Sequence, residues 1–168
     1  MIVLEVVEKF VSINGEGTKA GQLAVFIRFK GCNLNCKYCD TKWANEADAT
    51  AQQMTKEDIL EYVLSTGVKN VTLTGGEPLL RDGIEDVIEC LADNNLNVEI
   101  ETNGSIPLDN IRKLHKDNVT FTMDYKLSCS GMEQAMRLEN FSVLNKNDTV
   151  KFVAGCHEDL VRMKQIIE

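Results

Sequence analysis

The sequence contains no long apolar run, and its longest uninterrupted apolar stretches are only a few residues. A helix that crosses a bilayer needs about 20 consecutive apolar residues, so no membrane partner is expected. The N-terminus, MIVLEVVEKF, carries acidic residues where a secretory signal peptide has a basic segment followed by a longer apolar core. We therefore expect a cytoplasmic protein.

Basic residues are in the minority. Lys and Arg number 18 against 26 Asp and Glu, the net charge is −8, and no four basic residues follow one another. Proteins that bind the nucleic-acid backbone carry basic faces, so nucleic acid is not an expected partner. With 43% hydrophobic residues, the 168-residue chain is long enough to form one globular domain with its own core.

Histidines and closely spaced cysteine pairs are also few. The two histidines, His115 and His157, lie far apart, and among six cysteines only Cys36 and Cys39 have the C-x2-C spacing. A structural zinc site needs four ligands, and a thioredoxin-like redox pair would leave Cys32 without a role. Neither kind of site accounts well for the three cysteines of the segment GCNLNCKYCDTKWA.

The other three cysteines, Cys90, Cys129 and Cys156, are isolated in the sequence. Cysteines of a cytosolic chain are expected to be reduced or to bind metal, and free cysteine is among the most buried residue types. We therefore predict three reduced thiols in or near the core.

Strand-like and helix-like segments alternate along the chain. Thr55 with Asp58 predicts a capped helix start, and Gly67 predicts its end. The alternation predicts an α/β fold, in which a parallel sheet of two-sided apolar strands is covered by helices and one extra strand and a glycine loop precede it. Strands are predicted at 23–30, 70–76, 97–104, 119–126 and 148–155, and helices at 55–67, 82–95, 108–116, 131–138 and 157–168.

Polar or glycine-rich loops follow all five predicted strands. Ligands of such sheets bind at the carboxyl ends of the strands, so we expect these loops to form one site. They are GCNLNCKYCDT (31–41), TGGEP (74–78), ETNG (101–104), DYKLS (124–128) and AGCH (154–157).

The C-x3-C-x2-C spacing of Cys32, Cys36 and Cys39 suits an iron–sulfur cluster. Thiolates hold such clusters, usually as four ligands, and three thiolates would leave one iron open to a small chelating ligand. The spacing and the TGGEP segment resemble the two signatures of the radical S-adenosylmethionine superfamily. The resemblance implies a [4Fe–4S] cluster whose open iron binds S-adenosylmethionine.

The segment 10–44, FVSINGEGTKAGQLAVFIRFKGCNLNCKYCDTKWA, is more specific. With LTGGEPLL, ETNG and a lysine in the loop after the fourth predicted strand, it resembles the 7-carboxy-7-deazaguanine synthase family of queuosine biosynthesis. The resemblance implies a partial (βα)6 barrel and a Mg²⁺-assisted ring contraction of 6-carboxy-5,6,7,8-tetrahydropterin with loss of ammonia. It also implies a flavodoxin- or ferredoxin-like electron donor and a homodimer.

The same resemblance assigns roles to residues. Thr41 is expected to hold Mg²⁺, since a hydroxyl suits a hard cation, and Arg28 to bind the pterin carboxylate through a bidentate contact. Glycines of the TGGEP segment let the backbone approach a ligand closely, and Glu77 offers an acceptor for an ammonium group or shapes the turn. The expected cluster ligands are Cys32, Cys36 and Cys39; the expected cofactor-binding residues are Tyr38, Cys39, Asp40, Gly75, Gly76, Glu77, Asp124, Tyr125 and Lys126; the expected substrate-binding residues are Ile13, Asn14, Gly15, Arg28 and Thr74.

The sequence also departs from the family pattern. Asn14 stands where the family has glutamine, and residues 124–126 (DYK) stand where it has Ser-Pro-Lys, which leaves Lys126 the best supported of the three. Family members are longer, so we expect residues 1–168 to be a single radical-SAM domain with an incomplete C-terminus that lacks the last strand. Two alternatives stay open, a glycyl-radical-enzyme activase and a non-catalytic metal-binding module.

Overall fold

A computed structural model describes residues 2–168 of the chain as an α/β structure around a seven-stranded sheet. The strand order is β3-β1-β2-β4-β5-β6-β7. From β2 to β7 the neighbouring strands are parallel, and β1 runs antiparallel to both β2 and β3. The strands are β1 (Leu4–Ile13), β2 (Leu23–Phe29), β3 (Gln52–Met54), β4 (Asn70–Gly75), β5 (Asn97–Thr102), β6 (Val119–Tyr125) and β7 (Thr149–Phe152).

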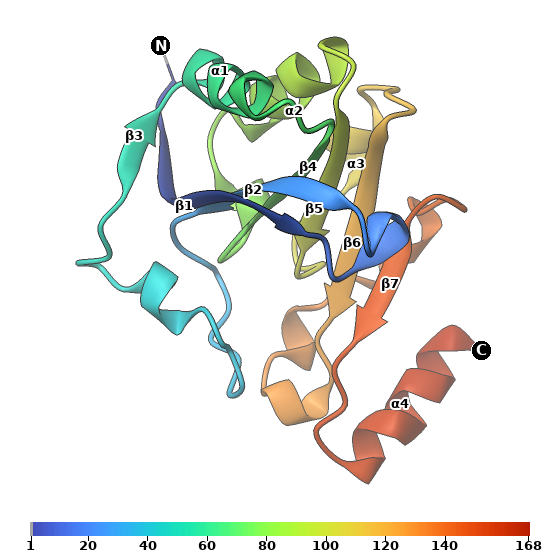
Figure 1. Cartoon of the computed structure of the whole chain (residues 1–168). Helices are drawn as coiled ribbons and strands as arrows, with labels where there is room; N and C mark the ends of the chain where they lie inside the picture. The colour runs from blue at the N-terminus through green and yellow to red at the C-terminus, as the bar shows by residue number, and fades with distance from the viewer. Residues whose placement is uncertain (1) are drawn as a thin grey trace.

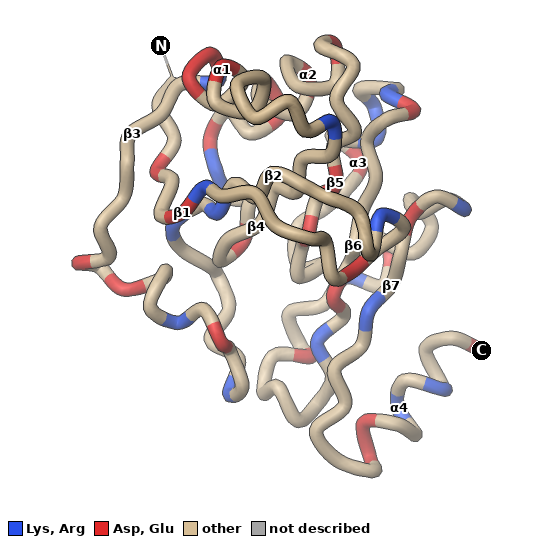
Figure 2. The backbone as a smooth tube through the Cα atoms, in the orientation of Figure 1, with Lys and Arg blue, Asp and Glu red and all other residues tan. Residues whose placement is uncertain are grey.

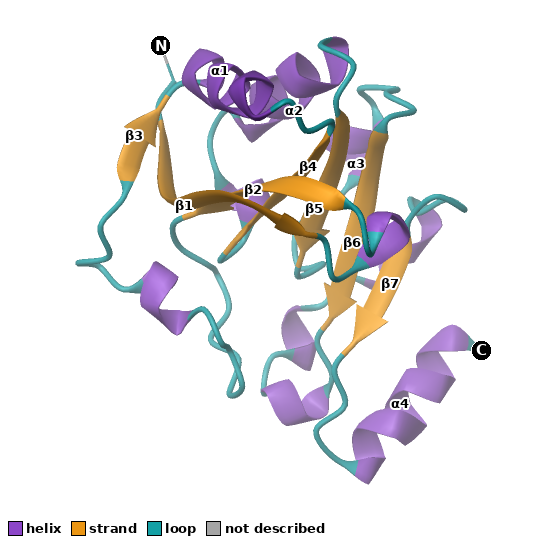
Figure 3. Cartoon of the chain, in the orientation of Figure 1, coloured by secondary structure: helices purple, strands orange, loops and turns teal. Residues whose placement is uncertain are grey.

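The five parallel strands and the extra N-terminal strand confirm the predicted order of elements, while β3 was not predicted. Two helices are shorter than predicted: the segment 108–116 forms a single turn, and 131–138 forms only 3-10 turns. The helices are α1 (Lys56–Thr66), α2 (Ile84–Asp93), α3 (Asp109–Arg112) and α4 (His157–Ile167), as Figure 3 shows. The 3-10 turns are η1 (Gly17–Lys19), η2 (Lys42–Asn45), η3 (Pro78–Leu80), η4 (Ser128–Ser130), η5 (Glu133–Ala135) and η6 (Leu138–Ser142).

Helix α1 begins and ends where the sequence predicts. The Thr55 side chain accepts a hydrogen bond from the Asp58 N–H, and the Asp58 carboxylate accepts one from the Thr55 N–H, which forms a capping box. Gly67 ends the helix with a φ of 71°, a left-handed conformation that glycine adopts without steric cost. Local sequence chemistry thus fixes this helix independently of the sheet.

The strands are apolar on one face, whereas two-sided apolar strands were predicted. In β4, Val71 and Leu73 are fully buried and belong to the core, while Thr72 and Thr74 point to the other face. In β5, Ile100 lies on the core face and Glu99 on the opposite one. The inner face of the curved sheet is therefore polar, because it lines a cavity and not a second layer of helices.

The sheet is curled but open. Figure 1 shows the β1–β2 ribbon passing across β4 to β6, while α1 and α2 lie together on one side. The edges are β3 and β7, which pair with one neighbour each. The open sheet agrees with the expected partial barrel.

Helix α4 forms where predicted, but its apolar face is only partly buried. Leu160 is 48% exposed and Ile167 is 65% exposed, and Asp159 is the buried residue of this helix. In Figure 1 the helix lies beyond the edge strand β7.

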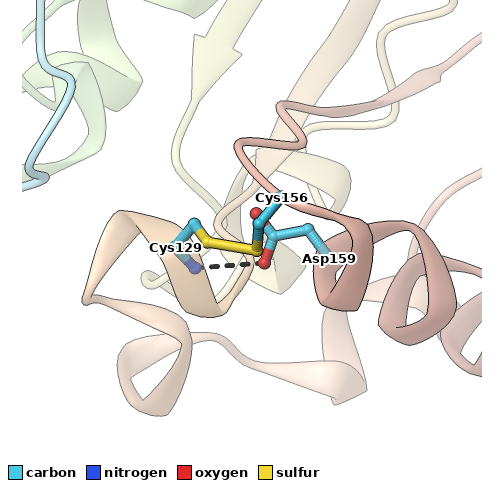
Figure 4. A group of neighbouring side chains, drawn as sticks. All are labelled: Cys129, Cys156 and Asp159. Atoms are coloured by element: carbon cyan, nitrogen blue, oxygen red, sulfur yellow. Dashed lines mark hydrogen bonds between the residues drawn. A yellow bond between two sulfur atoms is a disulfide. The ribbon is translucent and has the colours of Figure 1, made fainter.

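The prediction of reduced thiols at Cys129 and Cys156 is wrong in this structure, because the two form a disulfide. Figure 4 shows Asp159 beside them. The Asp159 carboxylate accepts hydrogen bonds from the Cys129 N–H (3.0 Å) and the Gly155 N–H (2.9 Å), and so draws η4 and the start of α4 together. Cys90 is a free, partly buried cysteine.

Charged residues are spread along many elements. Figure 2 shows Lys and Arg on strands, loops and helices. Among the described residues, no helix is both long and apolar enough to cross a membrane.

Candidate functional site

The largest feature at the carboxyl ends of the parallel strands is a cavity of about 440 Å³. Four of the five predicted loops supply residues to it; the AGCH segment does not, although the preceding Val153 does. It is lined by Glu16, Arg28, Cys32, Leu34, Cys36, Tyr38, Cys39, Asp40, Thr41, Asn45, Thr74, Gly75, Gly76, Glu101, Thr102, Asn103, Thr122, Asp124, Lys126, Lys151 and Val153.

The three predicted cluster ligands lie together at this cavity, on the loop that follows β2. Cys36 is buried, and Cys32 and Cys39 are partly exposed. Among the described residues, the group of three metal-binding side chains within 4.8 Å of one another is Cys129, Cys156 and Asp159. The three loop cysteines line one cavity and are three thiols of the kind that bind an iron–sulfur cluster.

Hydrogen-bond donors face the loop thiols. Cys32 Sγ accepts from the Leu34 N–H (3.4 Å) and from Asn103 Nδ2 (3.6 Å). Burial raises the pKa of Cys32, and the Leu34 N–H counteracts this rise. Burial also raises the pKa of Cys36, which the positive charge of Lys126 counteracts. The pocket therefore supplies donors and a cation that stabilise thiolates, the form that binds metal.

Two glycines at the end of β4 let this strand approach the cysteine loop. A Cβ atom on Gly75 would overlap the Phe29 backbone, and one on Gly76 would overlap the Gly31 carbonyl and Asn45 Oδ1. Gly75 also has a φ of 153°. A side chain at either position would push the two loops apart, so glycine is required by close approach.

Glu77 does not line the cavity, so of its two expected roles the structure supports the one in the turn. Its side chain is completely buried. The carboxylate accepts hydrogen bonds from the Asn103 N–H (2.7 Å), Thr102 Oγ1 (2.9 Å) and the Leu79 N–H (3.1 Å). Burial raises its pKa to about 7 against the opposing effect of these donors. Glu77 thus ties the loop after β4 to the loop after β5.

In the segment 124–126, two of the three predicted cofactor residues face the cavity. Lys126 Nζ lies 2.8 Å from Asp124 Oδ2, and both residues line the cavity. Burial would lower the pKa of Lys126, but the carboxylate of Asp124 raises it above the ordinary value. Tyr125 does not line the cavity and is buried on the other side of β6, with its ring centroid 5.9 Å from that of Phe141.

Two side chains at the cavity leave oxygen atoms without a partner. Among the described residues, Asp124 Oδ1 and Asn45 Oδ1 are buried acceptors with no hydrogen bond. Buried polar atoms are almost always paired. These two acceptors therefore mark places where a ligand with N–H or O–H groups would fit.

Several predicted residues lie at the cavity with additional protein contacts. Arg28 Nε donates to Glu8 Oε2 at 2.9 Å, and its side chain is 17% exposed. Thr41 Oγ1 lies 3.6 Å from Cys39 Sγ, and Tyr38 Oη lies 3.5 Å from the Val153 carbonyl oxygen. Asp40 and Thr74 also line the cavity.

Ile13, Asn14 and Gly15 do not line the cavity. Ile13 is 65% exposed at the end of β1. The amide of Asn14 is buried and bonded to Glu99 and Thr72, so in this structure it is turned away from the cavity.

Sequence reasoning assigned no role to Glu16 and Lys151, which both line the cavity. Lys151 Nζ lies 2.6 Å from Glu16 Oε1 and 3.6 Å from Asp124 Oδ2. Burial would lower the pKa of Lys151, but its hydrogen bond to Glu16 raises it. The parallel register pairs Asp124 with Lys151, so the two side chains lie next to each other on the same face of the sheet.

Glu101 and Asn103 belong to the predicted ETNG loop, and both line the cavity. Burial raises the pKa of Glu101. Asn103 Nδ2 donates to Cys32 Sγ, as described above, so this turn also contacts a predicted cluster ligand.

Comparisons with known proteins agree with the geometry. Residues 26–125 match the radical SAM superfamily. A 7-carboxy-7-deazaguanine synthase of Clostridium acetobutylicum is 60% identical over 164 residues, covering 97% of this chain and 74% of that protein. A protein of the same name from Methanospirillum hungatei JF-1 is 34% identical over 165 residues, covering 98% and 67%. The crystal structure of QueE from Escherichia coli has a TM-score of 0.76 and 25% identity, covering 98% of this chain and 77% of that one.

Proposed function

The chain belongs to the 7-carboxy-7-deazaguanine synthase family of radical S-adenosylmethionine enzymes, and we propose that the 440 Å³ cavity is its reaction site. The reaction is the ring contraction of 6-carboxy-5,6,7,8-tetrahydropterin to 7-carboxy-7-deazaguanine with loss of ammonia. The observation that carries the placement is one cavity lined by three cysteines of a single loop, by Arg28 and by the Asp124–Lys126 pair.

The cavity fits the cofactors of the superfamily, a [4Fe–4S] cluster and S-adenosylmethionine. Cys32, Cys36 and Cys39 would hold the cluster, and the unpaired oxygens of Asp124 and Asn45 would accept hydrogen bonds from S-adenosylmethionine. When bound, these groups supply the one-electron chemistry that starts the reaction. Lys126 keeps a positive charge beside Cys36, which supports the thiolate form of that ligand.

The pterin carboxylate would bind Arg28. Glu8 takes the Nε edge of its guanidinium, so the two Nη groups remain to form a fork of N–H donors on a carboxylate. Thr74 of β4 is paired with Arg28 of β2 in the sheet, and its hydroxyl would add a contact to the substrate. This pairing supports a shared role for two of the five predicted substrate residues, which lie side by side on neighbouring strands.

Thr41 would hold Mg²⁺ with the substrate, as the family pattern implies. Its hydroxyl lies beside Cys39, and the neighbouring Asp40 also lines the cavity. Oxygen ligands suit Mg²⁺, which usually keeps several waters and binds few protein groups. The proposal needs only one hydroxyl from the protein and the oxygens of the substrate.

A protein electron donor is required by this class of chemistry, and a flavodoxin- or ferredoxin-like donor is proposed. A homodimer and a cytoplasmic location are likewise proposed from the family resemblance. The glycyl-radical-activase alternative is disfavoured, because the relatives named above are 7-carboxy-7-deazaguanine synthases.

Replacing a cluster ligand tests the site. Cys36→Ala should lose the cluster after anaerobic reconstitution, whereas wild type should bind about four irons per chain, because two thiolates cannot hold three irons. Cys90→Ala is a matched control, since Cys90 is free and lies on α2 away from the cavity. Iron and sulfide analysis gives the result, and full iron content in Cys36→Ala with a colourless Cys90→Ala would contradict the assignment.

A further inference from the structure

We propose that Glu99 is a positioning residue. Together with Asn14 and Gly17, it closes the floor of the reaction cavity and separates this cavity from solvent at the amino ends of the strands. This inference rests on the proposed function. The floor cluster consists of Asn14, Gly17, Thr72, Glu99 and Thr122, and Glu99 is its central member.

Glu99 is 3% exposed on the inner face of β5. Its Oε2 accepts a hydrogen bond from Asn14 Nδ2, and its Oε1 accepts one from Thr122 Oγ1 at 2.5 Å. Asn14 Nδ2 also lies 3.3 Å from Thr72 Oγ1. One carboxyl group therefore joins β4, β5 and β6 to the loop that follows β1.

Gly17 rests directly on this carboxyl group. A Cβ atom on Gly17 would overlap Glu99 Oε1 and would lie 2.5 Å from Thr122 Oγ1. The φ of Gly17 is 66°, in the left-handed region. Backbone packed this closely against the carboxyl group leaves no room for a water between them.

The floor cluster separates two cavities. The reaction cavity is lined by Thr74, Glu101 and Thr122 on one side of the cluster. A second cavity of about 330 Å³ is lined by Thr72 and Glu99 and by residues at the amino ends of the strands. Without the floor cluster, the two cavities would join, and bulk water would reach the substrate from the amino ends of the strands.

The orientation of the Asn14 side-chain amide is fixed by hydrogen bonds at both its oxygen and its nitrogen. Its Oδ1 accepts the Glu16 N–H at 3.1 Å, so Nδ2 must be the atom that faces Glu99. Glu16 in turn pairs with Lys151 of β7 at 2.6 Å. Through Asn14, Glu99 thus positions Glu16 in the wall of the reaction cavity. The same contacts link the loop after β1 to β7, although β1 and β7 are not neighbours in the sheet.

The seal has a chemical purpose for a reaction that passes through radicals. Excluding water from an active site prevents reactive species from being lost to side reactions. A leaking floor should therefore allow S-adenosylmethionine to be cleaved without product. The expected signature is an increased ratio of 5′-deoxyadenosine to 7-carboxy-7-deazaguanine, with the cluster intact.

Glu99→Met is the direct test, because it keeps the length of the side chain but removes both acceptors, whereas glutamine could still accept from Asn14 and donate to the Thr122 hydroxyl. The amides of Asn14 and Glu16 should exchange with solvent about tenfold faster, the factor for losing one buried hydrogen bond to a carboxyl group. The 5′-deoxyadenosine to product ratio should rise severalfold, with iron content unchanged. Glu61→Met, the same change on the exposed face of α1, should leave both readings at wild-type values.

Asn14→Ala removes the other half of the contact from a loop instead of the core. It should reproduce both effects, and it serves as the test in case Glu99→Met does not fold. In wild type, the Glu16 amide should be strongly protected. Rapid exchange of that amide in wild type, or variants with unchanged exchange and unchanged product ratio, would overturn the proposal. A wild-type protein that shows protection but makes no product would instead refute the proposed function.

Discussion

The buried carboxyl group of Glu77 illustrates how single residues shape the site from outside it. It accepts three hydrogen bonds from the neighbouring loops, and burial raises its pKa to about 7. The folded chain therefore binds more protons than the unfolded chain between the ordinary pKa of 4.5 and about 7. A stability that depends on this group must fall as pH rises through that window.

We predict that the cluster-free protein loses on the order of 3 kcal/mol of its free energy of unfolding from this group between the two pKa values. Glu77→Gln should flatten this part of the pH profile, since glutamine does not titrate. Denaturant unfolding at several pH values measures the slope. The exposed substitution Glu61→Gln should retain it, and equal slopes in Glu77→Gln and wild type would show that Glu77 is already ionised when buried.

Thr41 gives a second prediction at this scale. Thr41→Ala should retain iron and bind S-adenosylmethionine, because its hydroxyl is not a cluster ligand. Its product rate should respond less to Mg²⁺ than that of wild type, by about tenfold if one oxygen ligand is lost. Titration of Mg²⁺ in the assay measures this. Wild-type behaviour at limiting Mg²⁺ would remove Thr41 from the metal site.

Among single residues, motif positions were more predictable than orientations. The alternation of β6 places Asp124 at the cavity and turns Tyr125 into the core, which a strict period of two predicts once the inner face is known. The orientation of the Asn14 side chain depends on its hydrogen bond to Glu99, a residue 85 positions away. No local pattern reveals a contact of that sequence separation.

At the scale of elements, the turn η4 and helix α4 are held together by few contacts. The Cys129–Cys156 disulfide closes a loop of 27 positions, and Asp159 accepts two backbone hydrogen bonds beside it. Since α4 exposes much of its apolar face, packing contributes little to its position. The cross-link and Asp159 therefore hold this end of the chain against the loop that carries Lys126.

We predict that the double variant Cys129→Ser/Cys156→Ser lowers the free energy of unfolding by about 3–4 kcal/mol relative to the oxidised protein, because the unfolded chain regains the entropy of an open loop. Thermal unfolding with and without a dithiol reductant measures this. The reductant should destabilise wild type and leave the double variant unchanged. A reductant-insensitive wild type would show that the pair does not form a disulfide in solution.

The alternating elements were predictable because their signals are local. The capping box and Gly67 define α1, and apolar strands bounded by glycines define β2 and β4. β3 escaped prediction because it is only QQM and forms by pairing with β1. The disulfide escaped because two isolated cysteines carry no spacing signal.

At the scale of the whole molecule, the curled sheet combines two functions on its two faces. The outer face packs on α1 and α2 to form the core, and the inner face carries the polar groups of the cavity. The loop of Asn14 and Gly17 closes the floor where no strand pairing does so. The fold and the cysteine site were predicted from sequence patterns, whereas this floor depends on tertiary contacts between distant residues.

We propose that this cavity performs pterin ring contraction and that hydrogen abstraction from the pterin starts the reaction. The most direct measurement uses the anaerobically reconstituted wild-type chain with S-adenosylmethionine, a reductant and 6-carboxy-5,6,7,8-tetrahydropterin deuterated at C6. We predict that deuterium appears in 5′-deoxyadenosine as 7-carboxy-7-deazaguanine forms. Cleavage of S-adenosylmethionine by a cluster-loaded chain, without deuterium transfer and without product, would contradict the account.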